Sequence, residues 1–358
     1  MVEQRVGVFG ANGHTGRFVA AELIRRGLPA RWIGRNQNAL SDLQTALGEG
    51  DIRLASVEDP ASLRHAFEGL DAVINCAGPF LDTARPVIAA ALDAGCHVLD
   101  ITAEQVTVLD TIATFDSAAQ AAGRVVMPAV AFFGGLADLL ATSLMQDWTE
   151  VDEIEIAVAL DSWRPTQGTR LTGERNTAPR LVVRDGALAP IPTQPPRTRW
   201  SFPDPFGEQP VACVALSEII LLSRHVRADR ITSYMNAKPL ADLADAATPT
   251  LRNRGIGQAS EQVFTVSARV SRGTQVRQAT LDGRDIYAVS APLAVEAVER
   301  LLRGEKRFSA GVRAPGEMFD AHAFLAALSP VLHRTGFPSS ASRPHSHSIV
   351  PGGFEVTS

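Results

Sequence analysis

Short apolar runs alternate with longer amphipathic stretches over the first third of the chain. Each run is rich in Val, Ile, Leu or Ala and is only a few residues long, which predicts a buried strand. The segments between the runs place apolar residues at helical spacing, as Val19 and Leu23 do. Regular alternation of strand and helix predicts an α/β fold with a doubly wound parallel sheet over residues 1–130. We predict strands at 5–10, 30–34, 52–55, 71–76, 97–101 and 124–128.

The pattern changes after residue 130. A helix is expected near 134–146, and the following stretches alternate apolar with polar residues between Gly, Pro and Asp turns, as in 153–160, 181–184 and 263–270. This period predicts a second, α+β domain over 131–288 that contains a mostly antiparallel sheet.

Helical spacing returns near Ser290. We expect helices at 291–302 and 320–328, and we expect the segment 289–335 to pack back on the first domain. Ser, Pro, His and Gly dominate 339–358, so a disordered tail is predicted there. His345 and His347 in that tail lack a further donor at ligand spacing, and no metal site is predicted.

Composition narrows the functional classes. The chain has 358 residues, 45% of them hydrophobic, and its net charge of −5 provides no basic field for nucleic acid. The apolar stretch 125–145 is interrupted by Pro128 and Asp138, so we interpret it as a strand and a packed helix and not as a membrane span. A small-molecule substrate is the expected partner, and a homodimer is among our expectations.

Three widely spaced cysteines, Cys76, Cys96 and Cys213, form no Cys-x-x-Cys pair. They indicate neither a disulfide framework nor a zinc site. No export signal precedes the first predicted strand, so we expect a cytoplasmic protein.

A glycine-rich segment, Gly10-Ala-Asn-Gly13-His-Thr-Gly16-Arg, joins the first predicted strand to the first predicted helix. Glycines allow a sharp turn and close approach to a pyrophosphate, while a helix N-terminus offers free N–H donors and a positive dipole end. A plain strand-to-helix turn is the alternative, but a dinucleotide is the expected ligand because strand and helix both flank the loop. The residues assigned to the phosphate site are Gly10, Asn12, Gly13, His14, Thr15 and Gly16, with phosphate contact and solvent exposure both open for His14.

The second strand ends at Gly34-Arg35-Asn36, where many NAD-binding folds place an acid for the ribose 2′-hydroxyl. An arginine at that point offers donors to a 2′-phosphate instead, so Arg35 and Asn36 favour NADP over NAD. A solvent-exposed Arg35 at a strand end is the alternative.

The fourth strand ends at Cys76, Ala77, Gly78 and Pro79, whose small residues would let the ribose and nicotinamide approach the backbone. A plain turn, with Cys76 as a buried cysteine, is the other interpretation there.

Polar groups after the fifth strand are candidates for the substrate site. Asp100 lies at the end of that strand, with Thr102 and Glu104 just beyond it, and the two acids are equally suited to capping the next helix. Arg170 is a candidate clamp for a substrate carboxylate, with a surface ion pair as the alternative. We therefore assign Asp100, Thr102 and Arg170 to the catalytic group.

Two residues, Tyr234 and Lys238, match the Tyr-x-x-x-Lys spacing of short-chain dehydrogenases. The preceding residues predict a strand and Pro239 follows at once, so we interpret the match as a coincidence. Motifs for hydrolases and phosphoryl transfer do not occur in the sequence.

Taken together, the glycine-rich segment, Gly34-Arg35-Asn36, the segment 75–80 and His97-Val-Leu-Asp100-Ile-Thr-Ala-Glu104 resemble the saccharopine dehydrogenase-like NAD(P)-binding oxidoreductases. The resemblance implies a Rossmann domain, a substrate domain, and hydride transfer between a nicotinamide and a substrate. The sequence departs from the family in the segment 131–139, which lacks a proline, and at Ala103, where a glycine is frequent. Our first hypothesis is therefore an NADP-dependent oxidoreductase, and the second is a non-catalytic NADP-binding redox sensor.

Overall fold

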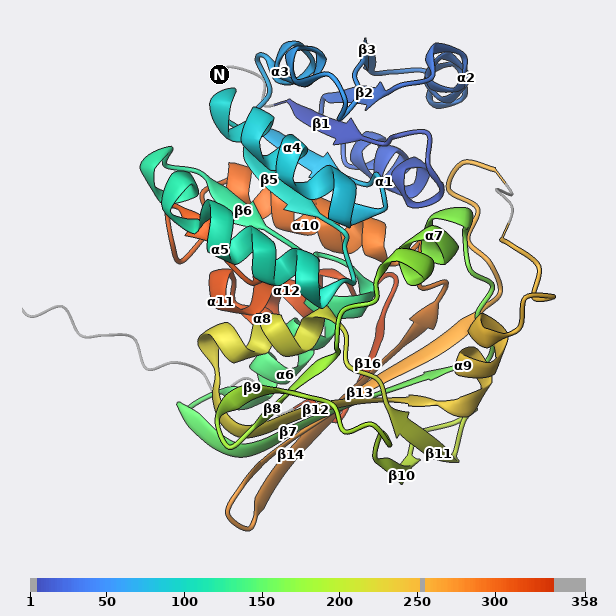
Figure 1. The fold of residues 1–358 in the computed structure, drawn as a ribbon, viewed down its shortest axis with the longest axis vertical. Coiled ribbons are helices and arrows are strands. Elements are labelled where there is room, and N and C mark those ends of the chain that lie inside the picture. Colours follow the sequence, from blue (N-terminus) through green and yellow to red (C-terminus); the bar gives the residue numbers. More distant parts are fainter. Residues whose placement is uncertain (1–4, 252–254, 338–358) are drawn as a thin grey trace, which may run out of the picture.

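A computed structural model describes residues 5–251 and 255–337. Its first sheet has seven parallel strands in the order β15-β6-β5-β4-β1-β2-β3 (Figure 1). The strand order reverses between β1 and β4, which is where ligands bind in doubly wound sheets. The strands are β1 (Val6–Phe9), β2 (Ala30–Gly34), β3 (Asp51–Leu54), β4 (Ala72–Asn75), β5 (His97–Asp100), β6 (Val125–Met127) and β15 (Gly311–Val312).

Helices cover both faces of this sheet, and the apolar side chains of β1, β2 and β4 are buried beneath them (Figure 1). The predicted α/β class with a parallel doubly wound sheet is thereby confirmed, and all six predicted strands occur. The seventh strand was not predicted, because β15 has only two residues, one of them glycine. The helices are α1 (His14–Arg25), α2 (Gln37–Leu47), α3 (Pro60–Phe67), α4 (Phe80–Asp93) and α5 (Gln105–Ala121).

The second sheet is mixed and mostly antiparallel, as the alternating pattern predicted. Its main path is β10-β11-β12-β7-β13-β14-β16, in which only the β7–β12 pair is parallel, while β8 pairs with β12 and β9. The strands are β7 (Glu150–Leu160), β8 (Leu181–Arg184), β9 (Ala187–Pro190), β10 (Arg197–Ser201), β11 (Glu208–Cys213), β12 (Arg227–Asn236), β13 (Val263–Arg272), β14 (Gln275–Arg284) and β16 (His333–Thr335).

The remaining helices connect the two sheets. The apolar stretch 125–145 forms β6, a short irregular turn η1 (Phe132–Leu136) and helix α6 (Ala137–Met145), which packs on β13 and β14. Helix α10 (Ser290–Leu302) packs against α1, whereas α12 (Ala321–Ala327) packs against α6. The other helices are α7 (Gln167–Arg175), α8 (Ser217–His225), α9 (Ala237–Ala244) and α11 (Pro315–Met318).

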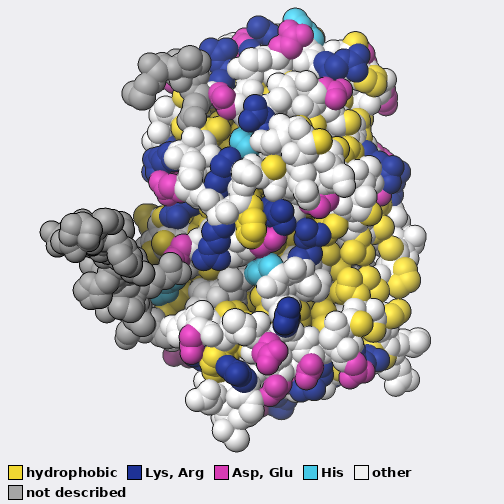
Figure 2. Space-filling view, turned by 90° about the vertical axis from the view of Figure 1, so that its left-hand side faces the viewer, with side chains coloured by type: hydrophobic (Ala, Val, Ile, Leu, Met, Phe, Trp, Pro, Cys, Tyr) yellow, Lys and Arg dark blue, Asp and Glu magenta, His cyan; other side chains and the backbone are white. Residues whose placement is uncertain are grey.

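None of the helices within 5–251 and 255–337 is long and apolar enough to cross a membrane. Acidic and basic side chains are interspersed over the face in Figure 2, and hydrophobic side chains gather toward its lower right. The predicted tail at 339–358, with His345 and His347, lies outside the described residues.

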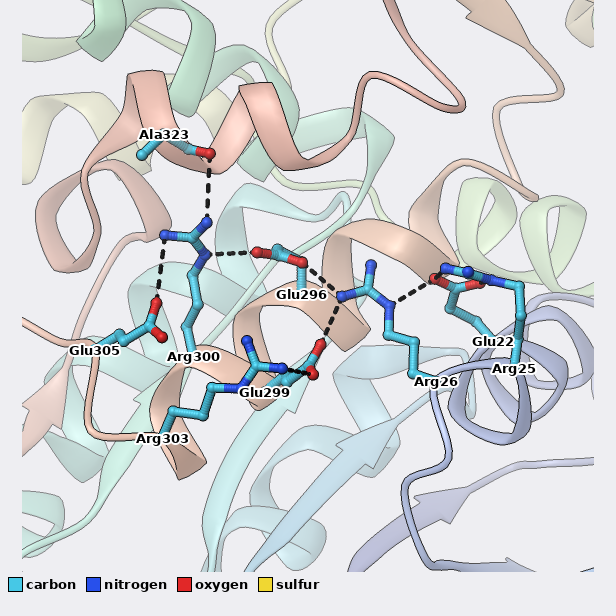
Figure 3. A network of polar contacts seen from close by, with 9 residues as sticks. All are labelled: Glu22, Arg25, Arg26, Glu296, Glu299, Arg300, Arg303, Glu305 and Ala323. Carbon is cyan, nitrogen blue, oxygen red and sulfur yellow. Dashed lines mark hydrogen bonds and ion pairs between the residues drawn. The ribbon is translucent and has the colours of Figure 1, made fainter.

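An ion-pair network joins α1 to α10 (Figure 3). Nη1 of Arg26 lies 2.5 Å from Glu296 and 2.7 Å from Glu299, and Nε lies 2.8 Å from Glu22. The Arg26 side chain is only 13% exposed, so these charges are largely withdrawn from water. The network therefore anchors the helix that follows the glycine-rich segment to the C-terminal part of the chain.

Replacing Arg26 with Ala should lower the free energy of unfolding by about 2 kcal/mol, because three carboxylates would lose their shared partner in a poorly hydrated setting. Arg25→Ala is the matched control, since Arg25 is 66% exposed and pairs only with Glu22; it should cost less than about 0.5 kcal/mol. Urea unfolding measures both. Equal losses in the two variants would contradict this role for Arg26.

Candidate functional site

A cavity of 1720 Å³ opens at the carboxyl ends of β1, β2 and β4. Helix α7 lies over it, between the two sheets and below α1 in Figure 1. The first sheet and its loops contribute one part of the lining, and the second half of the chain contributes the rest. The predicted cofactor residues that line the cavity are Gly10, Asn12, Gly13, His14, Thr15, Arg35, Asn36, Cys76, Ala77, Gly78 and Pro79.

Backbone atoms lie so close to Gly10 and Gly16 of the glycine-rich loop that no side chain fits at either residue. A Cβ added to Gly16 would lie 2.2 Å from the carbonyl oxygen of Gly10, so Gly16 is buried behind the loop and does not line the cavity. Gly10 has a φ of +80°, and its own added Cβ would meet Ala77 at 2.9 Å. The loop thus packs directly on the turn that follows β4.

The N-terminus of α1 has no side-chain cap. By contrast, Asn36 caps α2 by accepting a hydrogen bond from the N–H of Ala39, and Asp59 caps α3. The first N–H groups of a helix need acceptors, and an anion can supply them. An uncapped helix start at the edge of a cavity is therefore suited to a phosphate group.

Arg35 is exposed at the cavity rim, just beyond the end of β2. Within the described part of the chain its guanidinium makes no hydrogen bond or ion pair. Asn36 uses its Oδ1 atom, an acceptor, in the cap of α2. Of the two residues predicted to select NADP, Arg35 is the one that carries a positive charge toward a 2′-phosphate.

Side-chain hydrogen bonds fix the turn after β4. The buried Asn75 accepts from the N–H of Ala77 at 3.0 Å, and the Thr83 hydroxyl donates to the carbonyl of Ala77 at 2.5 Å. Cys76 faces the cavity, and burial raises the pKa of its thiol. A neutral thiol agrees with the interpretation of Cys76 as a cysteine without nucleophilic chemistry.

Asp100 and Thr102 do not line the cavity, in contrast to the catalytic role expected from their position at the carboxyl end of β5. Asp100 accepts the N–H groups of Thr102 and Ala129, each at 2.9 Å, and Thr102 accepts the N–H of Glu104 at 3.1 Å. Both side chains are at most 2% exposed. They therefore shape the chain after β5 and act as positioning residues.

Glu104 does line the cavity, and its carboxylate caps a helix, although not the helix that it begins. One oxygen accepts from the N–H of Phe80 at the start of α4, and the other accepts from the Thr107 hydroxyl. Burial raises the pKa of this carboxyl group. The predicted alternative, a cap on the helix that follows Glu104, is wrong: α5 begins without a side-chain cap, and the carboxylate caps α4 instead.

Arg170 lies on α7 in the cavity wall and donates to the carbonyl of Thr248 at 2.6 Å. His14 also lines the cavity, and its ring packs edge-on against Phe18 and Tyr287 at centroid distances of 5.5 and 5.2 Å.

Tyr234 and Lys238 lie on β12 and α9, outside this lining, and Lys238 pairs with Asp242. These positions agree with a coincidental Tyr-x-x-x-Lys match.

Several lining residues were not anticipated from the sequence. The Tyr287 hydroxyl lies 3.0 Å from Nε1 of Trp163 and from the Thr169 hydroxyl, so it ties α7 to the segment before α10. Phe133, Trp163 and Arg180 also face the cavity. No local motif marks these residues, because long-range folding alone brings them to one wall.

Comparison with known proteins agrees with this geometry. Residues 10–126 match a family described as NAD(P)H-binding. A probable mitochondrial saccharopine dehydrogenase-like oxidoreductase of Arabidopsis thaliana is 27% identical over 45% of this chain and 39% of its own length. The human saccharopine dehydrogenase-like oxidoreductase is 31% identical over 27% of each chain. The matched segments therefore span well under half of these relatives.

The apo structure of saccharopine dehydrogenase (L-Glu forming) from Saccharomyces cerevisiae covers 93% of this chain and 99% of its own, with a TM-score of 0.63 and 12% identity. At that identity the likeness shows the fold. Together these findings confirm the resemblance to saccharopine dehydrogenase-like proteins and an NAD(P)-binding domain at the N-terminus.

Gly16→Ala should destabilise the protein by about 1–3 kcal/mol and weaken dinucleotide binding, since its Cβ would collide with a backbone oxygen that cannot move aside. Gly173→Ala is the stability control: that glycine is helical, nothing lies within 4 Å of its added Cβ, and alanine there should gain up to about 1 kcal/mol. Thermal unfolding and NADPH titration test the pair. A stable Gly16→Ala protein that binds normally would contradict the packing argument.

Burial raises the pKa of Asp100 from 3.8 to about 6, against the lowering effect of its two backbone hydrogen bonds. The folded protein then holds this proton more tightly than the unfolded chain, so the contribution of Asp100 to stability is present below pH 4 and is lost as pH rises through 6. Asp100→Asn keeps an acceptor oxygen but does not ionise. The variant should match the wild type near pH 4 and exceed its unfolding free energy at pH 7.5 by up to about 3 kcal/mol. Urea unfolding across pH 4–7.5 would refute this if the difference did not change with pH.

Proposed function

We propose that this chain is an NADP-dependent oxidoreductase that transfers a hydride between NADP(H) and a small-molecule substrate. The carrying observation is the uncapped start of α1, which opens into the cavity behind the tightly packed Gly10–Gly16 loop. The family match over residues 10–126 supports the nicotinamide nucleotide as cofactor class. The preference for NADP is supported by Arg35.

The lining residues fit the parts of such a cofactor. The N–H groups at the start of α1 would hold the pyrophosphate, and Arg35 would donate to the 2′-phosphate. The turn of Ala77, Gly78 and Pro79 would border the ribose and nicotinamide, because its small residues expose the backbone. When bound, the cofactor supplies the hydride.

The chain's own residues would bind and orient the substrate. Substrate would enter the part of the cavity under α7, between the turn after β4 and the second sheet. Arg170 remains a proposed contact for the substrate, although one of its donors is already held by the carbonyl of Thr248. Asp100 and Glu104 keep the wall after β5 in place through the backbone groups that they bind.

A cytoplasmic location and a homodimer belong to the same proposal. All three cysteines are free, which suits a reducing compartment, while the Arabidopsis relative is described as mitochondrial. Fractionation of source cells tests the location, and sedimentation velocity tests the dimer; a purely monomeric protein at micromolar concentration would exclude the dimer.

Arg35→Asp should weaken NADPH binding by about 10- to 100-fold and leave NADH binding nearly unchanged, because the charge-assisted bonds to the 2′-phosphate are replaced by repulsion. Fluorescence titration of both cofactors measures this. Arg64→Asp makes the same change of charge on exposed α3 and should affect neither cofactor.

Equal weakening of NADPH and NADH in Arg35→Asp would contradict NADP selection. NADPH consumption with a panel of imines, carbonyls and enoyl compounds separates the reductase from an NADP-binding sensor. A folded protein that binds NADPH but never oxidises it across that panel would count against the reductase.

A further inference from the structure

The cavity is larger than one ligand requires. Its 1720 Å³ exceeds the range of about 300–1,000 Å³ that is usual for a small-molecule site. The proposed cofactor would occupy the part lined by the first sheet. The part under α7 is therefore available to a second molecule. The residues that line this part indicate which chemical groups that molecule would have.

Apolar side chains line this second compartment opposite the polar side chains of α7, such as Gln167 and Thr172. Phe133 and Trp163 stack with a centroid distance of 5.1 Å and an interplanar angle of 29°. Leu240 and Leu243 of α9, together with Leu216, add aliphatic surface to the same cavity. Such a wall favours hydrocarbon over polar groups.

Arg180 is the charged group of this compartment that has no partner. Within the described residues its guanidinium makes no hydrogen bond or ion pair, although it is partly buried and burial lowers its pKa. The other cations and anions there are engaged or exposed: Arg170 binds the carbonyl of Thr248, Asp82 pairs with Arg175, and Glu174 lies in solvent.

The backbone next to Arg180 is held firmly. The buried Gln105 side chain donates to the carbonyl of Leu181 and accepts from its N–H, both at 2.8 Å, and it also donates to the carbonyl of Leu216 at 2.9 Å. Since Glu104 precedes Gln105 and binds the N–H of Phe80, this clamp places Arg180 near the turn that would border the nicotinamide. Two carboxylates, Glu218 and then Glu104, are close enough to raise the pKa of Arg180. Glu218 accepts from the N–H of Leu216, and Glu104 accepts from the N–H of Phe80 and the Thr107 hydroxyl; within the described residues neither makes a direct contact with the guanidinium.

We infer that the second compartment binds an apolar carboxylate, with its anionic end on Arg180 and its hydrocarbon part along Phe133, Trp163 and α9. This inference deepens the proposed function and rests on it for the identity of the neighbouring cofactor. It predicts a substrate with one anionic end and a hydrocarbon body, because Arg180 offers one bidentate site beside apolar side chains, while one donor of Arg170 is already held by the carbonyl of Thr248.

Calorimetric titration of the NADP⁺-saturated protein tests the inference with octanoate, octanol and glutarate as probes. Octanoate should bind more tightly than either octanol, which lacks the charge, or glutarate, which lacks the apolar body. Arg180→Met should weaken octanoate by about tenfold or more and leave octanol unchanged, since the bonds to a charged group are lost while the stem remains. Leu243→Asn should weaken octanoate and octanol alike.

Arg175→Met is the matched control, because it removes one positive charge from the exposed end of α7 outside the cavity lining; octanoate affinity should stay the same. Among residues 5–251 and 255–337 no group pairs with the Arg180 side chain, so Arg180→Met should fold normally, and unfolding curves check this. Tighter binding of glutarate than octanoate, or no effect of Arg180→Met, would overturn the inference. NADPH titration of the wild type and of each variant separates this inference from the proposed function. Normal NADPH binding without octanoate binding rejects this inference alone. Failure of NADPH to bind the wild-type protein rejects the proposed function.

Discussion

The approach of Gly16 to the carbonyl of Gly10 is the constraint on which the site depends. Because no Cβ fits between them, α1 can begin immediately behind the loop, and its first N–H groups face the cavity without a side-chain cap. The same loop packs on Ala77, so the turn after β4 is held against it. These two close contacts join the helix start proposed to bind the pyrophosphate to the turn proposed to border the nicotinamide.

The surrounding structure keeps this arrangement rigid in two ways. The Arg26 network ties the far end of α1 to α10, and the segment before α10 carries Tyr287, which contacts both His14 and α7. On the other side, Gln105 ties the start of α5 to β8 and to the start of α8. The cavity is therefore enclosed by elements from both halves of the chain, which suits a site where two molecules must meet in a fixed geometry.

Local patterns were sufficient for the first sheet. Runs such as Val6–Phe9 and Ala72–Asn75 are apolar throughout because parallel strands are buried on both faces, and this made them recognisable. The glycine loop and Arg35 were found for a similar reason, since each lies at a strand end that the fold places at one edge. The two-residue strand β15 offers no such pattern, and it forms because β6 supplies a partner.

The substrate wall could not be predicted in the same way. Asp100 ends β5 and Thr102 follows it, as site residues would, but these side chains accept hydrogen bonds from the neighbouring N–H groups of Thr102, Ala129 and Glu104. Arg180 lies in a loop without a recognisable motif, and it lines the cavity next to Leu181, which Gln105 holds in place. Contacts between distant parts of the chain decide which polar side chains remain free, and a sequence pattern does not record them.

A crystal structure grown with excess NADP⁺ tests the central claim most directly. The account predicts the pyrophosphate on the N–H groups at the start of α1, the 2′-phosphate on Arg35, and the nicotinamide beside the turn of Ala77 and Gly78. A cleft that stays empty under those conditions, or a coenzyme bound elsewhere on the protein, would contradict it.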